Sequence, residues 1–555
     1  MKLNGAEILM ECLLEQKVNT IFGYPGGAVL FIYDALYKYQ DKITHHLTSH
    51  EQGAAHAADG YARASGKVGV CLATSGPGAT NLVTGIATAY MDSVPMVAIT
   101  GNVGSALLGK DSFQEVDIAG VTMPITKHNF IVKDVTRLAD TVRRAFYIAQ
   151  EGRPGPVLID ITKDATSSLY EYDYKEPLPI PKKTDSVTDD DISRACALIE
   201  ASKKPLIYGG GGLIRADAAG ELLTFAEKID SPVTLSTMGL GAFPASNPRF
   251  TGMIGMHGAK ASNLATLECD LLIAIGARFS DRVASNVNRF APNAKILHLD
   301  IDPAEINKNV TVHDYVVGDV SWTLHRLNKA LEQQSHPEWM AKVNEMKKNY
   351  PITYPKDNAL RPQYVMEKVS EVSNGDAIVV TDVGQHQMFA AQYIKTDKPR
   401  HFLTSGGLGT MGFGLGAAVG ASLACPDKVV FEITGDGCFG MNNIELATAV
   451  EYGAKVIVIL INNHTLGMVR QWQKLFYDKR YSHTTLEKTT DFHKLAEAYQ
   501  VPAFTVTKQE EVEEVLKKAV SMQKTVFIQF DVDRDNHVYP MIPAGMGIDE
   551  FVDDE

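Results

Sequence analysis

The sequence holds few of the residues that build disulfide frameworks, zinc sites or nucleic-acid interfaces. Only six cysteines occur in 555 residues, far apart and never as CxxC or CxxH. This usage is typical of reduced, mostly buried thiols in a cytosolic protein and argues against disulfides and zinc ligands. The formal net charge is −13, whereas proteins that bind a nucleic-acid phosphate backbone carry a clustered excess of Lys and Arg. No nucleic-acid partner is therefore expected.

Long apolar runs are also missing. No stretch approaches the roughly 20 apolar residues that cross a bilayer. The N-terminal stretch MKLNGAEILMECLLEQ predicts an amphipathic helix carrying Glu7, Glu11 and Glu15. It lacks the basic start and apolar core of a signal peptide, and it is too acidic for a transit peptide. We therefore expect a cytoplasmic protein with no membrane partner.

What is present is the composition of an ordinary globular protein, 45% hydrophobic and 21% charged. The length predicts about three or four domains. Short apolar runs alternate with helical patterns along the chain, which indicates α/β domains built on parallel sheets covered on both faces. We expect three doubly wound domains at 1–171, 190–334 and 363–540, linkers at 172–192 and 335–362, and a tail at 541–555 that cannot be a regular helix.

The most informative stretch runs from Lys428 to Gln473. It predicts a buried strand at 429–434, a turn at Gly435-Asp436-Gly437, a helix at about 442–452 and a second buried strand at 456–461. Parallel strands joined by a right-handed crossover end at the same edge of a sheet, where α/β folds bind ligands. Asp436 and Asn463 should therefore lie close together.

An acid and an amide presented together suit Mg²⁺, which prefers oxygen ligands and often shares substrate phosphates. The glycines beside Asp436 would let backbone N–H groups approach a diphosphate. The alternative is a helix-capping Asp and an Asn pair that merely ends a strand. The spacing GDG-x24-NN resembles the diphosphate-anchoring motif of thiamine-diphosphate (ThDP) enzymes, which implies Asp436, Asn463 and the carbonyl of Thr465 as metal ligands.

Glu51 stands out in the N-terminal third, where a strand gives way to a helix of small residues in SHEQGAAHAADGYARASG. An acid at this position usually satisfies the helix dipole. ThDP enzymes, however, need a carboxyl group that protonates the aminopyrimidine of the cofactor, buried enough for its pKa to rise. Together with the metal motif, Glu51 is the favoured residue for this role.

Three glycine-rich segments carry weaker signals. GPGATN at 76–81 predicts a strand-to-helix turn. GLGTMG at 407–412 matches G-x-G-x-x-G, but the preceding RHFLTS is expected to be a poor buried strand, so an NAD site is disfavoured. The glycines at 209–212 and HLDID at 298–302 look like strand ends that contact a dinucleotide.

Across nearly all 555 residues the chain resembles the catalytic large subunits of acetohydroxyacid synthases, the biosynthetic acetolactate synthases. The resemblance is carried by the motifs FGYPGGAVLFIYDAL, SHEQGAAHAADGYARASG, DSFQEVDIAG, GRPGPVLIDITKD, GMHG, GARFSDRV, GQHQM, GLGTMGFGLGAA, GDG…NN and LGMVRQWQ.

The resemblance implies roles for individual residues, beginning with the reacting centre. Glu51 would activate the cofactor, and the Gly27 backbone would face an oxyanion. Phe113 and Gln114 would line the active site of a neighbouring subunit, with Lys163 near the substrate channel. Arg282 or Trp472 would select the acceptor keto acid by charge and shape.

It also implies two sets of cofactor contacts. The ThDP contacts would be Gln385, His386, Gly409, Met411, Gly437, Cys438, Leu466, Gly467 and Met468. The FAD contacts would be Arg153, Gly210, Gly211, Met256, His257, Gly258, Arg278, Arg282 and Asp300.

The implied activity is a ThDP- and Mg²⁺-dependent carboligation. Pyruvate loses CO₂ and its hydroxyethyl unit joins pyruvate or 2-ketobutyrate, with FAD in a structural role. The implied partners are further copies of the chain, as a dimer or tetramer with active sites between subunits, and a small regulatory subunit. The alternatives are a pyruvate oxidase, a catabolic acetolactate synthase without FAD, and a non-catalytic nucleotide-binding regulator. Glyoxylate carboligase is disfavoured because its counterpart of Glu51 is not acidic.

Three positions depart from the family pattern. Phe389 stands where Trp is usual, Ser280 replaces an acid, and Cys438 sits where Ser or Ala is frequent. The first two would alter flavin or cofactor packing, and the third would leave a thiol beside the diphosphate.

Overall fold

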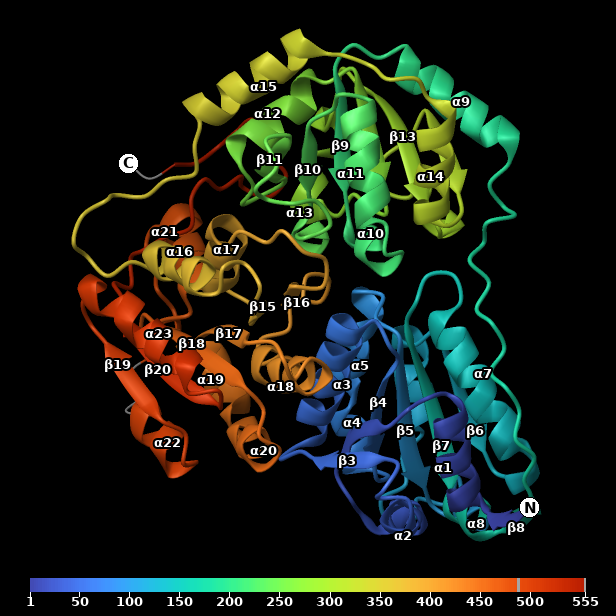
Figure 1. Ribbon diagram of the computed structural model, residues 1–555. Coiled ribbons are helices and arrows are strands. Elements are labelled where there is room, and N and C mark those ends of the chain that lie inside the picture. Colours follow the sequence, from blue (N-terminus) through green and yellow to red (C-terminus); the bar gives the residue numbers. More distant parts are fainter. Residues whose placement is uncertain (487–489, 554–555) are drawn as a thin grey trace.

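The computed structural model describes residues 1–486 and 490–553, which form three α/β units arranged around a common centre (Figure 1). Each unit, a sheet with the helices that cover it, is called a layer: the N-terminal, the central and the C-terminal layer. Each contains a six-stranded sheet whose strands all pair in parallel. The predicted fold class, three doubly wound parallel-sheet domains, is confirmed. The last two residues of the predicted tail, 554–555, lie outside the described part of the chain.

The N-terminal sheet, blue to cyan in Figure 1, has the strand order β3-β2-β4-β5-β7-β6. Its strands are β2 Thr20–Gly23, β3 Thr44–Leu47, β4 Gly69–Ala73, β5 Met96–Asn102, β6 His128–Val132 and β7 Pro156–Thr162. Its helices are α1 Gly5–Glu15, α2 Leu30–Lys38, α3 Glu51–Ser65, α4 Pro77–Asn81, α5 Val83–Met91, α6 Ile118–Thr122, α7 Leu138–Gln150 and α8 Lys163–Ser167. Two short strands, β1 Lys2–Asn4 and β8 Leu169–Glu171, pair antiparallel and tie the start of this part to its end.

The central sheet, green in Figure 1, has the order β11-β10-β9-β12-β13-β14. Its strands are β9 Pro205–Gly209, β10 Val233–Leu235, β11 Phe250–Met253, β12 Leu271–Ile275, β13 Lys295–Asp300 and β14 Asp314–Val317. Its helices are α9 Asp189–Glu200, α10 Gly211–Arg215, α11 Ala219–Lys228, α12 Lys260–Glu268, α13 Asp281–Ala284 and α14 Val320–Ala330.

The C-terminal sheet, orange to red in Figure 1, has the order β16-β15-β17-β18-β20-β19. Its strands are β15 Ile378–Thr381, β16 Phe402–Thr404, β17 Val430–Gly435, β18 Val456–Asn462, β19 Ala503–Val506 and β20 Val526–Asp531. Its helices are α16 Pro362–Val372, α17 Gln385–Tyr393, α18 Gly414–Ala424, α19 Asp436–Asn442, α20 Leu446–Glu451, α21 Gly467–Phe476, α22 Phe492–Ala498 and α23 Val512–Ser521.

Several expectations need correction. The segment 400–405 is not a poor strand: its residues Phe402–Thr404 form β16, which is fully buried and pairs with β15, and Phe402 and Leu403 pack into hydrophobic cores built from residues far along the chain. The expected helix at 442–452 is wrong in its start, since α19 begins at Asp436 and a short 3₁₀ turn separates it from α20.

The segment 335–362, expected to be a linker, contains the helix α15 Pro337–Asn349. Its apolar face, including Trp339 and Val343, packs into the core of the central layer, and the Trp339 Nε1–H donates to the Pro205 carbonyl at 2.8 Å. Much of the segment therefore belongs to the central layer.

The closest contact between layers joins the N-terminal and C-terminal sheets through α3 and α18 (Figure 1). Both helices are rich in Gly and Ala and almost wholly buried. A Cβ atom at Gly420 would lie 1.9 Å from the Ala57 carbonyl oxygen, and one at Gly60 would lie 2.0 Å from that of Ala417. The small residues thus allow backbone-to-backbone packing, which fixes the two sheets relative to each other.

Candidate functional site

Asp436 and Asn463 lie side by side at the carboxyl edge of the C-terminal sheet. Strands β17 and β18 pair in parallel with Gly435 opposite Ile461, so both side chains follow directly from adjacent strand ends. Both line one pocket together with Thr465. The predicted convergence of the two strand ends is therefore observed.

The chemistry of this edge suits a hard divalent cation. Burial raises the pKa of the Asp436 carboxyl to about 7, although backbone N–H groups of Gly437 and His464 oppose the shift. Among the described residues no Lys, Arg or His forms an ion pair with Asp436. One carboxylate, one amide and one carbonyl are oxygen donors of the kind that Mg²⁺ takes. No group of three His, Cys, Asp or Glu residues that could hold a metal occurs in the described chain, which leaves no donor set of the zinc type.

Two helix N-termini and several glycines also border this pocket. The N-termini of α17 and α21 both open onto it, at Gln385 and Gly467. A Cβ at Gly467 would lie 2.0 Å from Gln385 Oε1, and one at Gly437 would lie 2.6 Å from Leu466 Cδ2. The glycines keep the backbone accessible to a ligand. The pocket fits a diphosphate held through a metal ion.

Most residues assigned to ThDP by resemblance line this pocket. They are Gln385, His386, Met411, Gly437, Cys438, Leu466, Gly467 and Met468. Burial lowers the pKa of His386 to about 3, so this imidazole is neutral. Its Nε2 has no hydrogen-bond partner among the described residues, which leaves it for a ligand. Gly409 lies instead on the wall of a larger, neighbouring cavity.

That larger cavity has a volume of about 1220 Å³ and lies where the three layers meet. It exceeds the usual range of about 300–1,000 Å³ for small-molecule pockets, and so has room for a dinucleotide. The residues assigned to FAD that line it are Arg153, Gly210, Gly211, Met256, His257, Arg278, Arg282 and Asp300. Gly258 does not line it. Trp472 and Met468 do, and Met468 and Gly384 line both pockets, so the two adjoin.

The polar contacts of the cavity wall join the layers. Arg153, from the N-terminal layer, donates to Glu305 at 2.6 Å and to Asp302 at 3.2 Å in the central layer.

The glycines at 210 and 212 are required by packing, since a Cβ at either would lie within 2.6 Å of Gly276. The predicted strand ends therefore do face a ligand-sized space, but backbone packing already explains two of their glycines.

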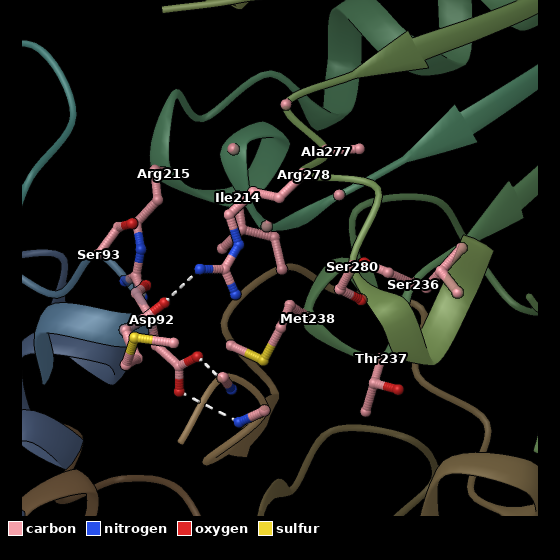
Figure 2. A pocket seen from close by; sticks show the side chains of 18 of the residues that line it. Asp92, Ser93, Ile214, Arg215, Ser236, Thr237, Met238, Ala277, Arg278 and Ser280 are labelled. Atoms are coloured by element: carbon pink, nitrogen blue, oxygen red, sulfur yellow. Dashed lines mark hydrogen bonds between the residues drawn. The ribbon is translucent and has the colours of Figure 1, made fainter. Parts of the chain in front are cut away.

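Figure 2 shows one wall of this cavity, where sequence reasoning missed the key residue, Asp92. Its carboxylate accepts from the backbone N–H groups of Gly406 and Gly407 at 3.1 and 2.7 Å, and from Arg63 Nη2 at 3.0 Å. Its backbone carbonyl accepts from Arg215 Nη2 at 3.2 Å. Burial lowers the pKa of Arg215 to about 9. Asp92 thus connects all three layers, and no local pattern marks it because its partners Gly406, Gly407 and Arg215 lie over 100 residues away.

Glu51 is the first residue of α3 and is buried, but it lines neither pocket. Its Oε2 accepts from Asn81 Nδ2 at 2.9 Å, and its Oε1 faces Gly78. Asn81 was quoted in the GPGATN turn without a role. Within one chain, the structure does not bring Glu51 to the pocket of Asp436.

The other N-terminal residues singled out by resemblance also lie away from both pockets. Phe113 is 87% exposed, and Gln114 has a left-handed backbone (φ 59°) and packs against Gly76. Lys163 begins α8 and is exposed. Gly27 opens a 3₁₀ turn with free space around it, as a Cβ there would meet nothing within 4 Å. Gly27, Phe113 and Lys163 are exposed, whereas Gln114 is half-buried.

The three departures from the family pattern have defined surroundings. Phe389 is buried and lines the pocket of Asp436. Ser280 precedes α13 and lines the large cavity. The Cys438 thiol donates to the Val383 carbonyl at 3.2 Å, and burial raises its pKa well above the usual range, so the group stays a neutral thiol. None of them replaces a donor to the cation site.

No helix in the described residues is long and apolar enough to span a membrane.

Comparison with known proteins gives a consistent result along the whole chain. Three family models match: the thiamine pyrophosphate enzyme N-terminal TPP binding domain at residues 3–121, the central domain at 192–327 and the C-terminal TPP binding domain at 382–530. Relatives include the acetolactate synthase large subunit of Haemophilus influenzae, 45% identical over 99% of this chain and 98% of its own length. The acetolactate synthase of Mycobacterium bovis is 48% identical over 99% and 91%. The probable acetolactate synthase large subunit of Methanocaldococcus jannaschii is 48% identical over 98% and 94%.

Proposed function

From the premise that this chain belongs to the acetolactate synthase large-subunit family of thiamine-diphosphate enzymes, we propose how its residues perform that activity. The enzyme releases CO₂ from pyruvate and joins the remaining two-carbon unit to a second 2-keto acid, giving 2-acetolactate or 2-aceto-2-hydroxybutyrate for branched-chain amino-acid biosynthesis. ThDP supplies the electron sink for the electron pair left when CO₂ departs. The observation that carries the proposal is the shared pocket of Asp436, Asn463 and Thr465.

Asp436, Asn463 and the Thr465 carbonyl would hold Mg²⁺ with the cofactor diphosphate. The raised pKa of Asp436 is the expected property of a buried carboxylate whose counter-charge is a bound cation. Helices α17 and α21 would direct their N–H groups at the diphosphate.

Glu51 would hold the proton that activates the cofactor. Its Oε2 already accepts from the Asn81 amide, so Oε1 is the atom that would exchange a proton with a ligand nitrogen. Because Glu51 is outside the pocket of Asp436, it would serve the pocket of a second subunit. The N-terminal layer that carries Glu51 also exposes several large apolar side chains, which supports a dimer because exposed apolar surface marks interaction sites: Tyr24, Leu30, Phe31, Leu107, Phe113 and Met123.

The large cavity would hold FAD as a structural group, with Arg153, His257, Arg278 and Asp300 among its contacts. Trp472 and Arg282 line the same cavity, which adjoins the ThDP pocket, and this supports their role in choosing pyruvate or 2-ketobutyrate as acceptor. Phe113, Gln114 and Lys163 would complete the site of the partner copy.

We also propose the boundaries 1–171, 190–334, 363–540 and 541–555 for the three domains and the tail, within which the three family matches fall. A small regulatory subunit is the proposed heterologous partner, as the relatives are named large subunits. The six free cysteines support a reducing, cytoplasmic location.

The test is an assay of the purified protein for acetolactate and CO₂, offering pyruvate alone or with 2-ketobutyrate. ThDP, Mg²⁺ and FAD are each omitted in turn. We expect product to require ThDP and Mg²⁺. Oxygen-dependent peroxide formation that matches pyruvate loss would favour a pyruvate oxidase instead, and full activity in a colourless, FAD-free preparation would favour a catabolic synthase.

A further inference from the structure

Three buried side-chain amides run in series from the cation site to the C-terminal segment. Asn463 Nδ2 donates to Gln385 Oε1 at 3.4 Å, and Gln385 Nε2 donates to Gln471 Oε1 at 3.0 Å. Gln471 then forms two bonds with the backbone of one residue: its Oε1 accepts from the Val538 N–H at 3.0 Å, and its Nε2 donates to the Val538 carbonyl at 2.9 Å. Gln471 is completely buried.

The direction of this series is fixed by its far end. A side-chain amide has an oxygen that accepts and a nitrogen that donates, and it can be turned over, but a backbone N–H only donates and a carbonyl only accepts. Val538 therefore sets the orientation of Gln471. Gln471 presents its oxygen to Gln385, and Gln385 in turn presents its oxygen to Asn463. The nitrogen of Asn463 is thereby engaged. Its oxygen accepts from the Thr465 N–H at 3.2 Å and keeps a second lone pair for a cation.

We propose that Gln471 is a positioning residue which, through Gln385, fixes Asn463 with its amide oxygen available to the metal ion. This inference rests on the proposed function of the Asp436 pocket. The C-terminal segment takes part through the backbone of Val538, so the metal site depends on a segment 75 residues further along the chain than Asn463.

Two further features indicate that the three amides are held in fixed positions. Gly467 leaves space for it, because a Cβ there would lie 2.0 Å from Gln385 Oε1 and 2.8 Å from Asn463 Nδ2. The segment after Val538 is also held in place: the Ile542 N–H donates to the Met256 carbonyl at 2.9 Å, and Ile542 and Ile548 are buried in the core of the central layer. The backbone that anchors Gln471 is therefore held in place by the segment that follows it.

The experiment compares Gln471→Met with Gln471→Glu. Met fills a similar volume without polar atoms, whereas Glu keeps an acceptor oxygen for both Gln385 and Val538, and a protonated Glu also keeps a donor. The readout is the Mg²⁺ dissociation constant of the ThDP-loaded protein without substrate, from tryptophan fluorescence. We expect Gln471→Met to weaken Mg²⁺ binding about 10- to 100-fold, the usual effect of losing a partner behind a metal ligand, and Gln471→Glu to weaken it less than about 3-fold.

The control is Gln392→Leu. Gln392 also donates to the C-terminal segment, at the Tyr539 carbonyl, and to the His257 carbonyl, but within the described residues it forms no hydrogen bond with a member of the series. Its Mg²⁺ affinity should equal that of the wild type. If Gln471 only filled space, Met would preserve the affinity and Glu would reduce it, and that result would overturn the inference. The melting temperature of each metal-free variant shows whether it folds; a Gln471→Met protein that melts like the wild type and binds Mg²⁺ as tightly also overturns it. Failure of the wild type to bind Mg²⁺ would instead refute the proposed function.

Discussion

At the scale of single residues, buried carboxyl groups in this protein differ in what surrounds them. Glu15 receives hydrogen bonds from Arg143, Tyr172 and the Lys175 backbone, and these lower its pKa against the opposing effect of burial. Glu432 is completely buried on β17, and neither oxygen has a hydrogen-bond partner among the described residues. Burial, and then the nearby Asp382, raise its pKa well above the usual range. Glu432 therefore holds its proton in the folded chain.

This difference predicts a stabilising substitution, Glu432→Leu. Below the unfolded pKa of about 4.3, a carboxyl whose pKa is raised by folding is protonated in both states, so its ionisation does not change the free energy of unfolding. Above that pH the carboxyl ionises in the unfolded chain but not in the folded one, and the fold is destabilised increasingly as the pH rises. The variant should gain about 1–3 kcal/mol in free energy of unfolding at pH 8, the cost of a buried unsatisfied polar group. Urea unfolding at pH 5 and pH 8 measures it, and the gain should be smaller at pH 5. A gain that grows toward low pH would contradict this account.

Glu51 gives a second prediction at this scale. Glu51→Gln keeps the size of the side chain but cannot exchange a proton, so turnover should fall at least about 100-fold, as expected for a lost acid–base group. ThDP affinity, measured by isothermal titration, should change little. The matched control is Glu7→Gln, because Glu7 likewise lies in the first turn of a helix and lines neither the pocket of Asp436 nor the large cavity. Retained turnover in Glu51→Gln would remove Glu51 from its role.

The reach of sequence reasoning is also clearest in individual residues. The spacing of Asp436 and Asn463 predicted their meeting because strand ends in a βαβ unit meet by geometry. Gln471 lay in a quoted motif but received no role, because its partners are the backbone of Val538 and a side chain 86 residues earlier. Asp92 was missed for the same reason. Long-range hydrogen bonds leave no periodic trace in a sequence.

At the scale of elements, the packing of α3 on α18 is the contact on which the arrangement of the outer layers depends. The sequence predicted a helix of small residues beginning at Glu51, but it predicted neither the helix at 414–424 nor the contact between the two. At several positions the two helix backbones lie so close together that only glycine fits between them. Strand β16 was expected to be poor and α15 was not predicted, for a related reason. Both segments are regular because they pack against residues far along the chain, which local composition does not show.

The prediction at this scale is that Gly420→Ala destabilises the protein by about 3 kcal/mol, because the added Cβ would lie 1.9 Å from the Ala57 carbonyl oxygen and force the helices apart. The control is Gly220→Ala in α11, where a Cβ meets nothing within 4 Å. There alanine should be neutral or stabilising by up to about 1 kcal/mol, its helix preference over glycine. Chemical unfolding of both variants measures the effect. Equal stability of the two would show that α3 and α18 do not constrain each other.

At the scale of the whole molecule, one chain holds the two halves of the proposed site in different places. Asp436 and Asn463 line the pocket at the C-terminal sheet edge, whereas Glu51 lies outside it. Sequence alone predicted both halves, and only the family resemblance suggested that subunits share them. A symmetric dimer would bring each Glu51 to the pocket of its partner and create two equivalent sites.

Co-expression of two differently tagged inactive chains, Glu51→Gln and Asp436→Ala, tests this arrangement most directly. In a mixed dimer one site receives both substitutions and the other receives neither. If subunits mix at random, the pool should recover roughly a quarter of wild-type acetolactate formation, and purified mixed dimers about half, as two-fold symmetry requires. If the mixed dimers are as inactive as either parent, the site lies within one chain and the account is wrong.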